Sequence, residues 1–510
     1  MAHAKIPRRR APSSFQTGPA TRIPDGNRCI RGAPGDGPGP RIGGRGRSLG
    51  SRGNVPARLT PCGEFTRGSG TALRPVNESS SSPATRRDFL KASTAAALVS
   101  AVAAPRMLTS RARAISPGDT IKIGLVGCGG RGTGAAAQAL AADSNSQLTA
   151  MGDVFERAIQ GSLRSVVGEV GEDRVQVKPE NRFVGLDAYQ KVIASGVDVV
   201  LLAAPPGFRP VHLRAAVEAG KHTFCEKPMA TDAPGVRSVL ESARLARERS
   251  LAIVAGFCWR YDYPLRELFK RIHDGQIGEI RALYGTYLTG PVKPMPPAES
   301  RPAGITDIEW MIRNWYNFNW LSGDGFVEQA VHTCDWLAWA MQDRMPASAT
   351  AVGGRQIPAH GGNIYDHIEA NYAWDNGTLG FLAQRQIPGC YGENNLVVLG
   401  TKGTATIDGR GPSITGERPW RYQGPRPNMY QVEHDELFAS IRAGKPINDG
   451  EWMATSTLLG ILGRSAAYTG QKITWDMILN SQQVLVPPIE DWDTKFEPEP
   501  MAMPGRTRFV

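Results

Sequence analysis

The sequence predicts an α/β protein in which a doubly wound parallel sheet is followed by an α/β domain with a large, mainly antiparallel sheet. Between about residues 120 and 258, short apolar runs alternate with helical patterns, as repeated β–α–β units do. A glycine-rich turn joins the first apolar run to the first helix. From about Trp259 the pattern changes to alternating strands with Asn-Gly and Lys-Gly turns, which is typical of antiparallel sheets.

The positive charge of the chain is concentrated at its N-terminus. The 510 residues carry a net charge of +11. Residues 1–84 hold 14 Lys and Arg against 4 Asp and Glu, whereas residues 115–510 hold 39 against 43. We therefore expect a slightly acidic folded part, which argues against nucleic-acid binding. Residues 1–84 also lack apolar periodicity, so we expect disorder there.

Residues 85–114 resemble a twin-arginine export signal. Arg86-Arg87 precede "DFLK" and an Ala-rich apolar run that is too short to span a bilayer. "ARA" at 112–114 fits a cleavage site, so we expect export by the twin-arginine machinery, a periplasmic location and no stable membrane insertion. Such signals stand near the start of a chain. We therefore expect translation to begin at about Val76, with most of residues 1–84 a mis-called N-terminal extension.

The segment from Thr120, "TIKIGLVGCGGRGTGAAAQALAAD", predicts a strand, a glycine loop and a helix. The loop contains Gly127-x-Gly129-x-x-Gly132, and a second strand ends at Asp153. In this context the pattern predicts dinucleotide binding, with the pyrophosphate on the helix N-terminus and Asp153 on the adenosine ribose. A carboxylate there repels a 2′-phosphate, so NAD is favoured over NADP, although Arg157 leaves NADP open.

The alternation continues through the first half of the mature chain. "VDVVLLAAPP" at 197–206 is the continuous apolar run of a strand covered on both faces. A helix starting near Pro210 and ending near Gly220, the strand "KHTFC", a helix over 232–249 and the strand "LAIVAGF" follow. We therefore predict a Rossmann-type NAD(P)-binding domain over 115–258. An α/β substrate-binding domain is predicted over 259–488, and a Pro-rich tail that wraps the surface or is flexible over 489–510.

The stretch "VEQAVHTCDW" at 327–336 predicts one helix face that carries three polar residues, Glu328, His332 and Asp335. Such a face can hold a metal, run acid–base chemistry or form a buried hydrogen-bond cluster. Metal sites of this kind use more nitrogen or sulfur ligands, and hydride transfer needs no metal, so we predict none. The seven cysteines form no C-x-x-C pair, which indicates neither a zinc site nor a disulfide framework.

Taken together, the glycine motif, Asp153, "AGKHTFCEKPMA" and "EQAVHTCDW" resemble the Gfo/Idh/MocA family from about Ile121 to Trp475. The leader, "GCGGRG" and "NWLSGDGFVEQAVH" resemble its exported branch. The resemblance implies an NAD(P)-dependent oxidoreductase that moves a hydride between the nicotinamide and a hydroxyl or carbonyl of a sugar or cyclitol. It also implies a homo-oligomer.

The resemblance assigns roles to individual residues. Lys227 would contact the reacting hydroxyl and the cofactor, His332 would accept or donate the proton, and Glu328 would bind substrate or orient the histidine. The residues expected to bind the cofactor are Gly127, Gly129, Gly130, Arg131, Gly132, Asp153, Pro205, Glu226 and Lys227.

The segment "IEWMIRNWYNFNWLSGDG" combines aromatic rings with planar polar groups, which suits sugar rings and equally suits a packing segment. The residues assigned to the substrate pocket are Arg260, Arg313, Asn314, Tyr316 and, in a supporting or structural position, Asp335. His367 is a weaker candidate. Two other functions stay open: an NAD-assisted glycosidase that retains and recycles its cofactor, and a non-catalytic nucleotide- or sugar-binding protein.

Overall fold

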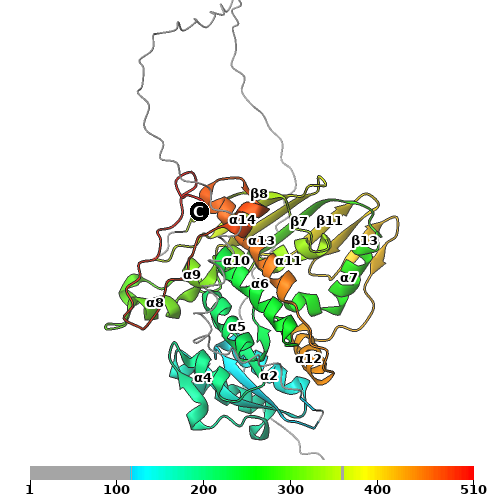
Figure 1. Cartoon of the computed structure of the whole chain (residues 1–510). Coiled ribbons are helices and arrows are strands. Elements are labelled where there is room, and N and C mark those ends of the chain that lie inside the picture. Colours follow the sequence, from blue (N-terminus) through cyan, green and yellow to red (C-terminus); the bar gives the residue numbers. More distant parts are fainter. Residues whose placement is uncertain (1–114, 117, 358–360) are drawn as a thin grey trace, which may run out of the picture. The chain divides into compact units, whose positions relative to one another are not determined.

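The computed structural model describes residues 115–116, 118–357 and 361–510 (Figure 1). The disorder predicted for 1–84 and the export signal predicted for 85–114 lie outside the described residues. Within them, a parallel sheet is followed along the chain by a larger, mainly antiparallel one. This arrangement confirms the predicted fold class.

The first sheet has six parallel strands in the order β3-β2-β1-β4-β5-β6. Its strands are β1 (Ile121–Val126), β2 (Ser146–Asp153), β3 (Arg182–Val184), β4 (Val199–Leu202), β5 (His222–Cys225) and β6 (Ile253–Ala255). Every residue of β4 is fully buried, as a strand covered on both faces requires. The strand order reverses between β1 and β4, and sheets of this kind bind ligands at the carboxyl ends of the strands at such a point.

Helices cover both faces of this sheet. One face packs on α4 (Ala188–Ala194), α5 (Arg209–Glu218) and α6 (Ala233–Glu248), and the other on α2 (Gly130–Ala142), α3 (Glu156–Val170) and α12 (Met429–Arg442). Local sequence sets their ends. Pro210 lies in the first turn of α5, Gly220 follows that helix with φ +73°, and Asp232 caps α6 by accepting a hydrogen bond from Gly235 N.

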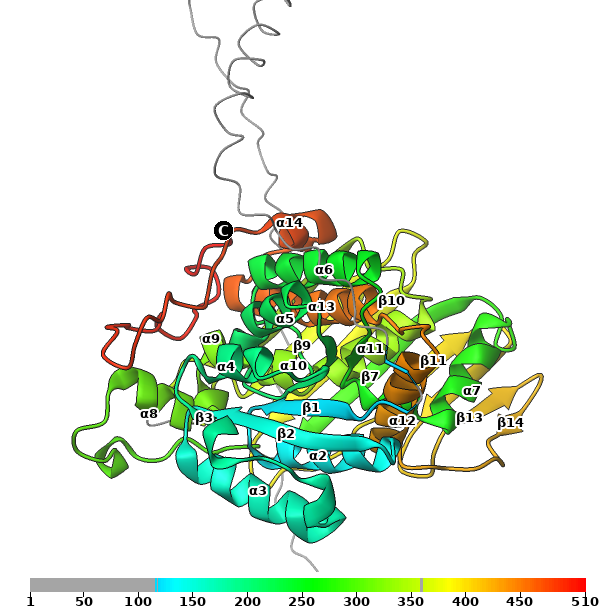
Figure 2. The ribbon, with the colours of Figure 1, turned by 60° about the horizontal axis from the view of Figure 1, so that its bottom comes forward.

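The chain returns to the first sheet late in the sequence. Helix α12 packs on α2, and beyond it Ile253 N donates to Ile447 O (2.9 Å) while Ala255 N donates to the Asp449 carboxylate (3.0 Å) (Figures 1 and 2). The predicted boundary at residue 258 did not anticipate this return, because contacts between segments so far apart leave no local pattern.

The second sheet has nine strands in the order β14-β13-β12-β11-β7-β10-β9-β8-β15. They are β7 (Ile280–Thr289), β8 (Ser348–Gly354), β9 (His367–Ala373), β10 (Leu379–Gln386), β11 (Leu396–Gly400), β12 (Gly403–Ile407), β13 (Ser413–Gly416), β14 (Trp420–Arg421) and β15 (Ile473–Thr474). Only the β10–β7 pair is parallel among these described strands. Two helices, α11 (Val331–Ala340) and α13 (Gly450–Thr469), pack on one face of this sheet.

Further α-helices lie in the described part of the chain. They are α7 (Tyr263–His273), α8 (Asp307–Arg313), α9 (Asn319–Ser322), α10 (Gly325–Glu328) and α14 (Trp475–Asn480). The C-terminal tail runs beside α8 and α9 and packs with them in a third hydrophobic cluster (Figures 1 and 2). No helix among the described residues combines the length and the apolar character needed to cross a bilayer.

Candidate active site

A cavity of about 1130 Å³ opens at the carboxyl ends of the parallel strands and is lined by both halves of the described chain. The first half contributes the glycine loop, the end of β2 and the loops after β4 and β5. The second half contributes residues near α8 and the segment joining α10 to α11. All nine residues predicted to bind the cofactor line this cavity: Gly127, Gly129, Gly130, Arg131, Gly132, Asp153, Pro205, Glu226 and Lys227.

The glycine loop is shaped to receive a pyrophosphate. Gly127 has φ +92°, which L side chains rarely adopt, and a Cβ added to Gly132 would lie 1.9 Å from Gly127 O. Gly129 and Gly130 face open space, so no side chain covers their backbone. The N-terminus of α2 has no side-chain cap and no acidic residue in its first turn. Its N–H groups are therefore free to bind an anion, and the residues present fit a dinucleotide.

Asp153 ends β2 at the side of the cavity where an adenosine ribose would lie. One carboxylate oxygen accepts from Cys128 N (2.7 Å) and the other from Phe155 N (2.9 Å). Burial raises the pKa of Asp153, and these backbone hydrogen bonds oppose the rise. Each oxygen keeps acceptor capacity, as binding to a pair of ribose hydroxyls requires.

Lys227 forms a buried ion pair with Glu328 across the two halves. Its Nζ lies 3.0 Å from Glu328 Oε1 and donates to Glu328 O at 2.6 Å, and the two side chains are 11% and 9% exposed. Gln329 Nε2 donates to the other carboxylate oxygen, and Tyr287 OH donates to Gln329 Oε1 at 2.7 Å. A chain of hydrogen bonds therefore connects Tyr287 to Lys227 along one wall of the cavity.

His332 lines the cavity beside this pair. Its ring lies against Trp259 and Phe257, with centroid distances of 4.7 and 6.0 Å. Its Nδ1 is buried and has no hydrogen-bond partner in the described structure. Burial, assisted by the Lys227 charge, holds the pKa of His332 well below its ordinary value. The imidazole is therefore neutral and able to accept a proton.

The predicted single helix through this stretch is interrupted. Helix α10 ends at Glu328 and α11 begins at Val331, because Ala330 N bonds to Gly325 O, five residues back, in a widened turn. Glu328 and His332 both line the cavity, whereas Asp335 does not. The three polar residues of the predicted face therefore do not converge, and no group of three potential metal ligands occurs in the described ranges.

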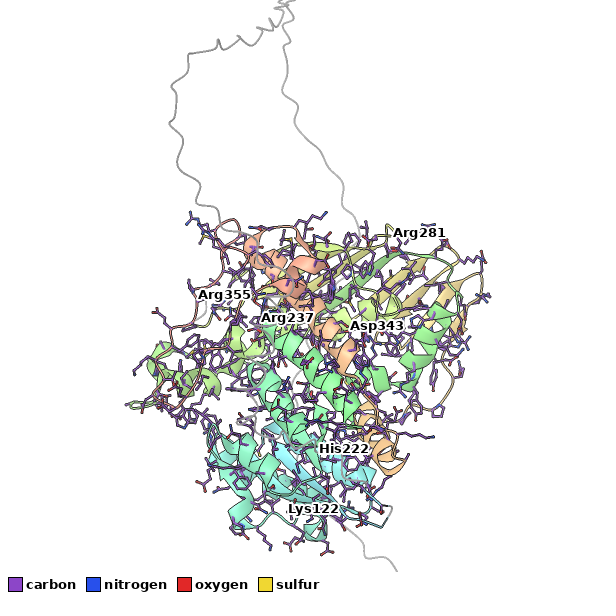
Figure 3. All side chains as sticks on the ribbon, in the orientation of Figure 1. Lys122, His222, Arg237, Arg281, Asp343 and Arg355 are labelled. Atoms are coloured by element: carbon purple, nitrogen blue, oxygen red, sulfur yellow. The ribbon has the colours of Figure 1, made fainter. Side chains whose placement is uncertain are left out.

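Asp335 and Arg260, assigned to the substrate pocket from the sequence, pair with each other instead. Arg260 lies 2.8 Å from Asp335 and 2.6 Å from Asp343, which Figure 3 labels. Asp335 is 1% exposed and also accepts from Ser456 Oγ (2.8 Å), so it joins α11 to α13. Burial raises the pKa of Asp335 against the effect of Arg260.

Three further candidates are also outside the cavity. Asn314 donates to Trp310 O, Tyr316 bonds to Gln386, and His367 bonds to Asp366. Arg313 does line the cavity, but at the Asp153 side, where its guanidinium lies 4.9 Å from the ring centroid of Phe155.

Sequence reasoning missed several residues that line the site. Tyr287 comes from β7, and burial together with the Glu328 charge raises its pKa to about 12. Gln329 joins it to Glu328, and Trp259 packs on His332. Trp259 lies four residues beyond the carboxyl end of β6, a position that could have marked it. The alternating pattern of β7 contains nothing that marks Tyr287.

The family models cover most of the described chain. The model for the oxidoreductase family with an NAD-binding Rossmann fold, Gfo/Idh/MocA, matches residues 121–257, and that for the Gfo/Idh/MocA C-terminal domain matches residues 265–406. The chain belongs to the Gfo/Idh/MocA family. It is a nicotinamide-dependent oxidoreductase, which confirms the predicted enzyme class and nicotinamide cofactor.

Individual relatives align over most of their own length. The inositol 2-dehydrogenase of Rhizobium meliloti (strain 1021) is 25% identical over 365 residues, which cover 68% of this chain and 97% of that protein. The crystal structure of the aldose-aldose oxidoreductase from Caulobacter crescentus complexed with glycerol superposes with a TM-score of 0.55 at 18% identity, covering 70% of this chain and 99% of that one. Levoglucosan dehydrogenase complexed with NADH and levoglucosan gives 0.55 at 17%, covering 69% and 99%. These two structures share the fold.

Proposed function

We propose that this oxidoreductase transfers a hydride between NAD and a hydroxyl or carbonyl carbon of a sugar or cyclitol. The observation that carries the proposal is the buried Lys227–Glu328 ion pair beside the neutral His332, within one cavity that also contains the glycine loop. Relatives named as inositol and levoglucosan dehydrogenases support the substrate class.

The residues of the site divide the work of alcohol oxidation. The cofactor, bound at the glycine loop and Asp153, supplies the hydride acceptor. Lys227 donates a hydrogen bond to the reacting oxygen, and its ion pair with Glu328 fixes the ammonium group in place. His332 takes the hydroxyl proton, because its neutral ring has an open acceptor position. Trp259 packs on the His332 ring and excludes water from that side.

The test uses the purified full chain and records NADH absorbance while cyclitols, monosaccharides, anhydrosugars and aryl glycosides are supplied. We expect substrate-dependent NADH formation, lowered about 100-fold or more in Lys227→Ala and His332→Ala. Lys472→Ala, an exposed lysine far along the chain from the site, is the control and should match the wild type.

Two results would contradict the proposal. Cleavage of an aryl glycoside with no net NADH would indicate a glycosidase that recycles its cofactor. Binding of nucleotide and sugar without turnover of any supplied compound would indicate a non-catalytic binding protein.

We further propose a preference for NAD over NADP. The buried Asp153 carboxylate supports it, since a 2′-phosphate at the same place would meet like charge. Arg157 follows on α3 and lines the same cavity, so it is the residue that would favour NADP. Asp153→Ser should reduce the difference between the dissociation constants for NADH and NADPH, measured by nucleotide fluorescence. An unchanged ratio would reject this role for Asp153.

Two proposals concern the whole chain. Residues 85–114 support export by the twin-arginine machinery to the periplasm, and a reporter fused to them should be exported only while Arg86-Arg87 are intact.

Exposed apolar side chains on the outer face of the second sheet support a homo-oligomer formed through that face.

A further inference from the structure

The second half of the chain reaches the adenosine end of the cofactor cavity. Asp153 and Phe155 mark that end, and Lys293, Ile312, Arg313 and Trp315 line it from the opposite side. None of these four lies near the Lys227–Glu328 pair in sequence, and Arg313 contacts Phe155 instead of the catalytic residues. The second half therefore covers the Asp153 end of the cavity as well as supplying Glu328 and His332.

We call this part of the second half, centred on α8, the cover. It has its own small hydrophobic core. The third hydrophobic cluster buries Ile308, Met311 and Ile312 of α8 together with Trp320 of α9, and Phe155 packs against it from the first half. The Arg313 guanidinium is fixed over Phe155 by two hydrogen bonds to Glu309, at 2.8 and 2.6 Å. Apolar burial thus packs α8 against Phe155, just beyond β2, and the ion pair within α8 holds the Arg313 guanidinium in position over that ring.

The C-terminal tail fastens the cover to both sides. Trp492 stacks on Phe155 (centroids 6.3 Å apart), and Phe496 meets Trp320 edge-on (5.8 Å). In the described structure, the hydrogen bonds of residues 486–498 stay within the tail. Apolar contacts of Val486, Ile489 and the two aromatic rings therefore attach it there.

Firm anchors lie on either side of this stretch of tail. Leu485 N donates to Asp232 at 2.8 Å, and Tyr365 OH donates to Ala502 O at 2.8 Å. The stretch between these two anchors is attached at both ends. It can therefore move away from the cover while its ends stay bound.

We propose that Phe155, Arg313, Trp320, Trp492 and Phe496 form a clasp over the adenosine end of the cavity, and that an adenine dinucleotide enters and leaves only when the clasp opens. The inference rests on the proposed function in that a nicotinamide cofactor occupies this cavity. It assigns Arg313 to the adenosine end, and it makes the tail a determinant of how long the cofactor stays bound.

The geometry gives the clasp a kinetic signature. Trp492 and Phe496 do not line the cavity, so removing either ring deletes no contact with the nucleotide. A gate that opens more often lets ligand in and out faster by the same factor, whereas a lost binding contact speeds release alone. The association rate, the dissociation rate and the affinity, measured together, therefore distinguish a gate from a lost binding contact.

The experiment is stopped-flow fluorescence of NADH binding to the full chain, with Trp492→Ala and Phe496→Ala as two independent variants. Both rings are half-buried in the tail, so their loss spares the main cores. We expect association and dissociation rates each to rise about three- to tenfold, the scale of one aromatic pair, with the dissociation constant changed by less than about twofold. Tyr391→Ala, which removes a ring that is 73% exposed, is the control and should leave both rates unchanged.

Three outcomes would overturn the clasp. Unchanged rates in both variants would show that the tail does not control access. Faster release with unchanged association and weaker affinity would show a lost contact and no gate. Absence of NADH binding to the wild type would reject the proposed function as well, whereas the first two results leave that function standing.

Discussion

At the scale of single residues, the Lys227 ammonium group has two electrostatic effects on the site. It neutralises Glu328 in a place where an unpaired carboxylate would be costly, and it disfavours a second positive charge on His332. Burial is the main cause of the lowered pKa of His332, and the Lys227 charge adds to it while Lys227 stays beside the reacting oxygen.

The depressed pKa of His332 predicts an unusual pH profile. The neutral ring is the active base, and its folded pKa lies well below 6.5, so acidification should protonate it only below the ordinary histidine range. We expect kcat/KM for alcohol oxidation to stay level as the pH falls through 6.5, with its acidic limb lying lower.

A pH–rate series of the wild type measures this limb, and His332→Gln should lack it while retaining a low residual rate. A limb centred on the ordinary value near 6.5 would contradict the assignment of a desolvated, neutral His332.

Residues that act within a local motif were predictable, and residues that act across the fold were not. The glycine loop and Lys227 follow strands and Asp153 ends one, so their positions come from the β–α alternation. Arg260 and Asp335 are 75 residues apart and pair only after α11 and the loop beyond β6 meet. No sequence pattern encodes that ion pair. In the sequence, the two residues of a buried pair look the same as polar residues of a binding pocket.

At the scale of elements, α12 completes the cofactor half from a distance in sequence. Its Glu433, fully buried, accepts from Arg131 at 3.0 Å, and Arg131 also pairs with Glu226. Burial, and then the Glu226 charge, raise the pKa of Glu433 well above its usual value. One arginine of the glycine loop is thus shared by two carboxyl groups from opposite halves.

Removal of the Glu433 side chain should test how much this contact contributes. Glu433→Ala leaves Arg131 with one fewer buried partner, so we expect the free energy of unfolding to fall by about 2 kcal/mol. NADH affinity should fall as well, because Arg131 lines the cavity. Denaturant unfolding and fluorescence titration measure the two effects.

Glu436→Ala on the same helix is the matched control. Glu436 pairs with Arg266 at a half-exposed position, so its loss should cost less than about 1 kcal/mol and leave NADH affinity unchanged. Equal destabilisation by the two substitutions would show that the Arg131–Glu433 contact contributes no more than a surface pair.

At the scale of the whole molecule, the second sheet has one covered and one open face. Leu283 of β7, Leu382 of β10 and Val398 of β11 are buried in the core beneath the helices, whereas Tyr284, next to Leu283 on β7, is 47% exposed. Other large apolar side chains exposed on the strands of this sheet are Val352, Leu379 and Leu399. Such an array on a sheet face is typical of a surface that another copy covers.

A charged substitution on this face should weaken self-association. Val352 is 67% exposed on β8, and Val352→Asp should lower the affinity between copies about tenfold or more if the face is the interface. Val211→Asp on α5, where valine is 56% exposed, introduces the same change on the first half and should have no effect. Light scattering across a dilution series measures both. A wild type that stays monomeric at all concentrations would reject the proposed oligomer.

The alternation of β7, β9 and β10 made the antiparallel sheet predictable, but the sequence did not indicate that β10 pairs in parallel with β7. Strand order depends on which segments meet across long connections, and alternation alone does not record it. The same limit applies to the tail, whose aromatic contacts depend on α8 and α9 being in place.

The late return of the chain to its first sheet has a consequence for modularity. A fragment ending at residue 258 would lack α12 and the Asp449 carboxylate, leaving apolar side chains of α2 in water and the amide of Ala255 without its acceptor. The cofactor half therefore depends on a segment that lies within the sequence of the substrate half, before α13 and β15. If one half were exchanged between relatives by a single crossover, the first sheet and the α12 segment that packs on it would come from different proteins. The smallest unit that can be exchanged is therefore the two halves together.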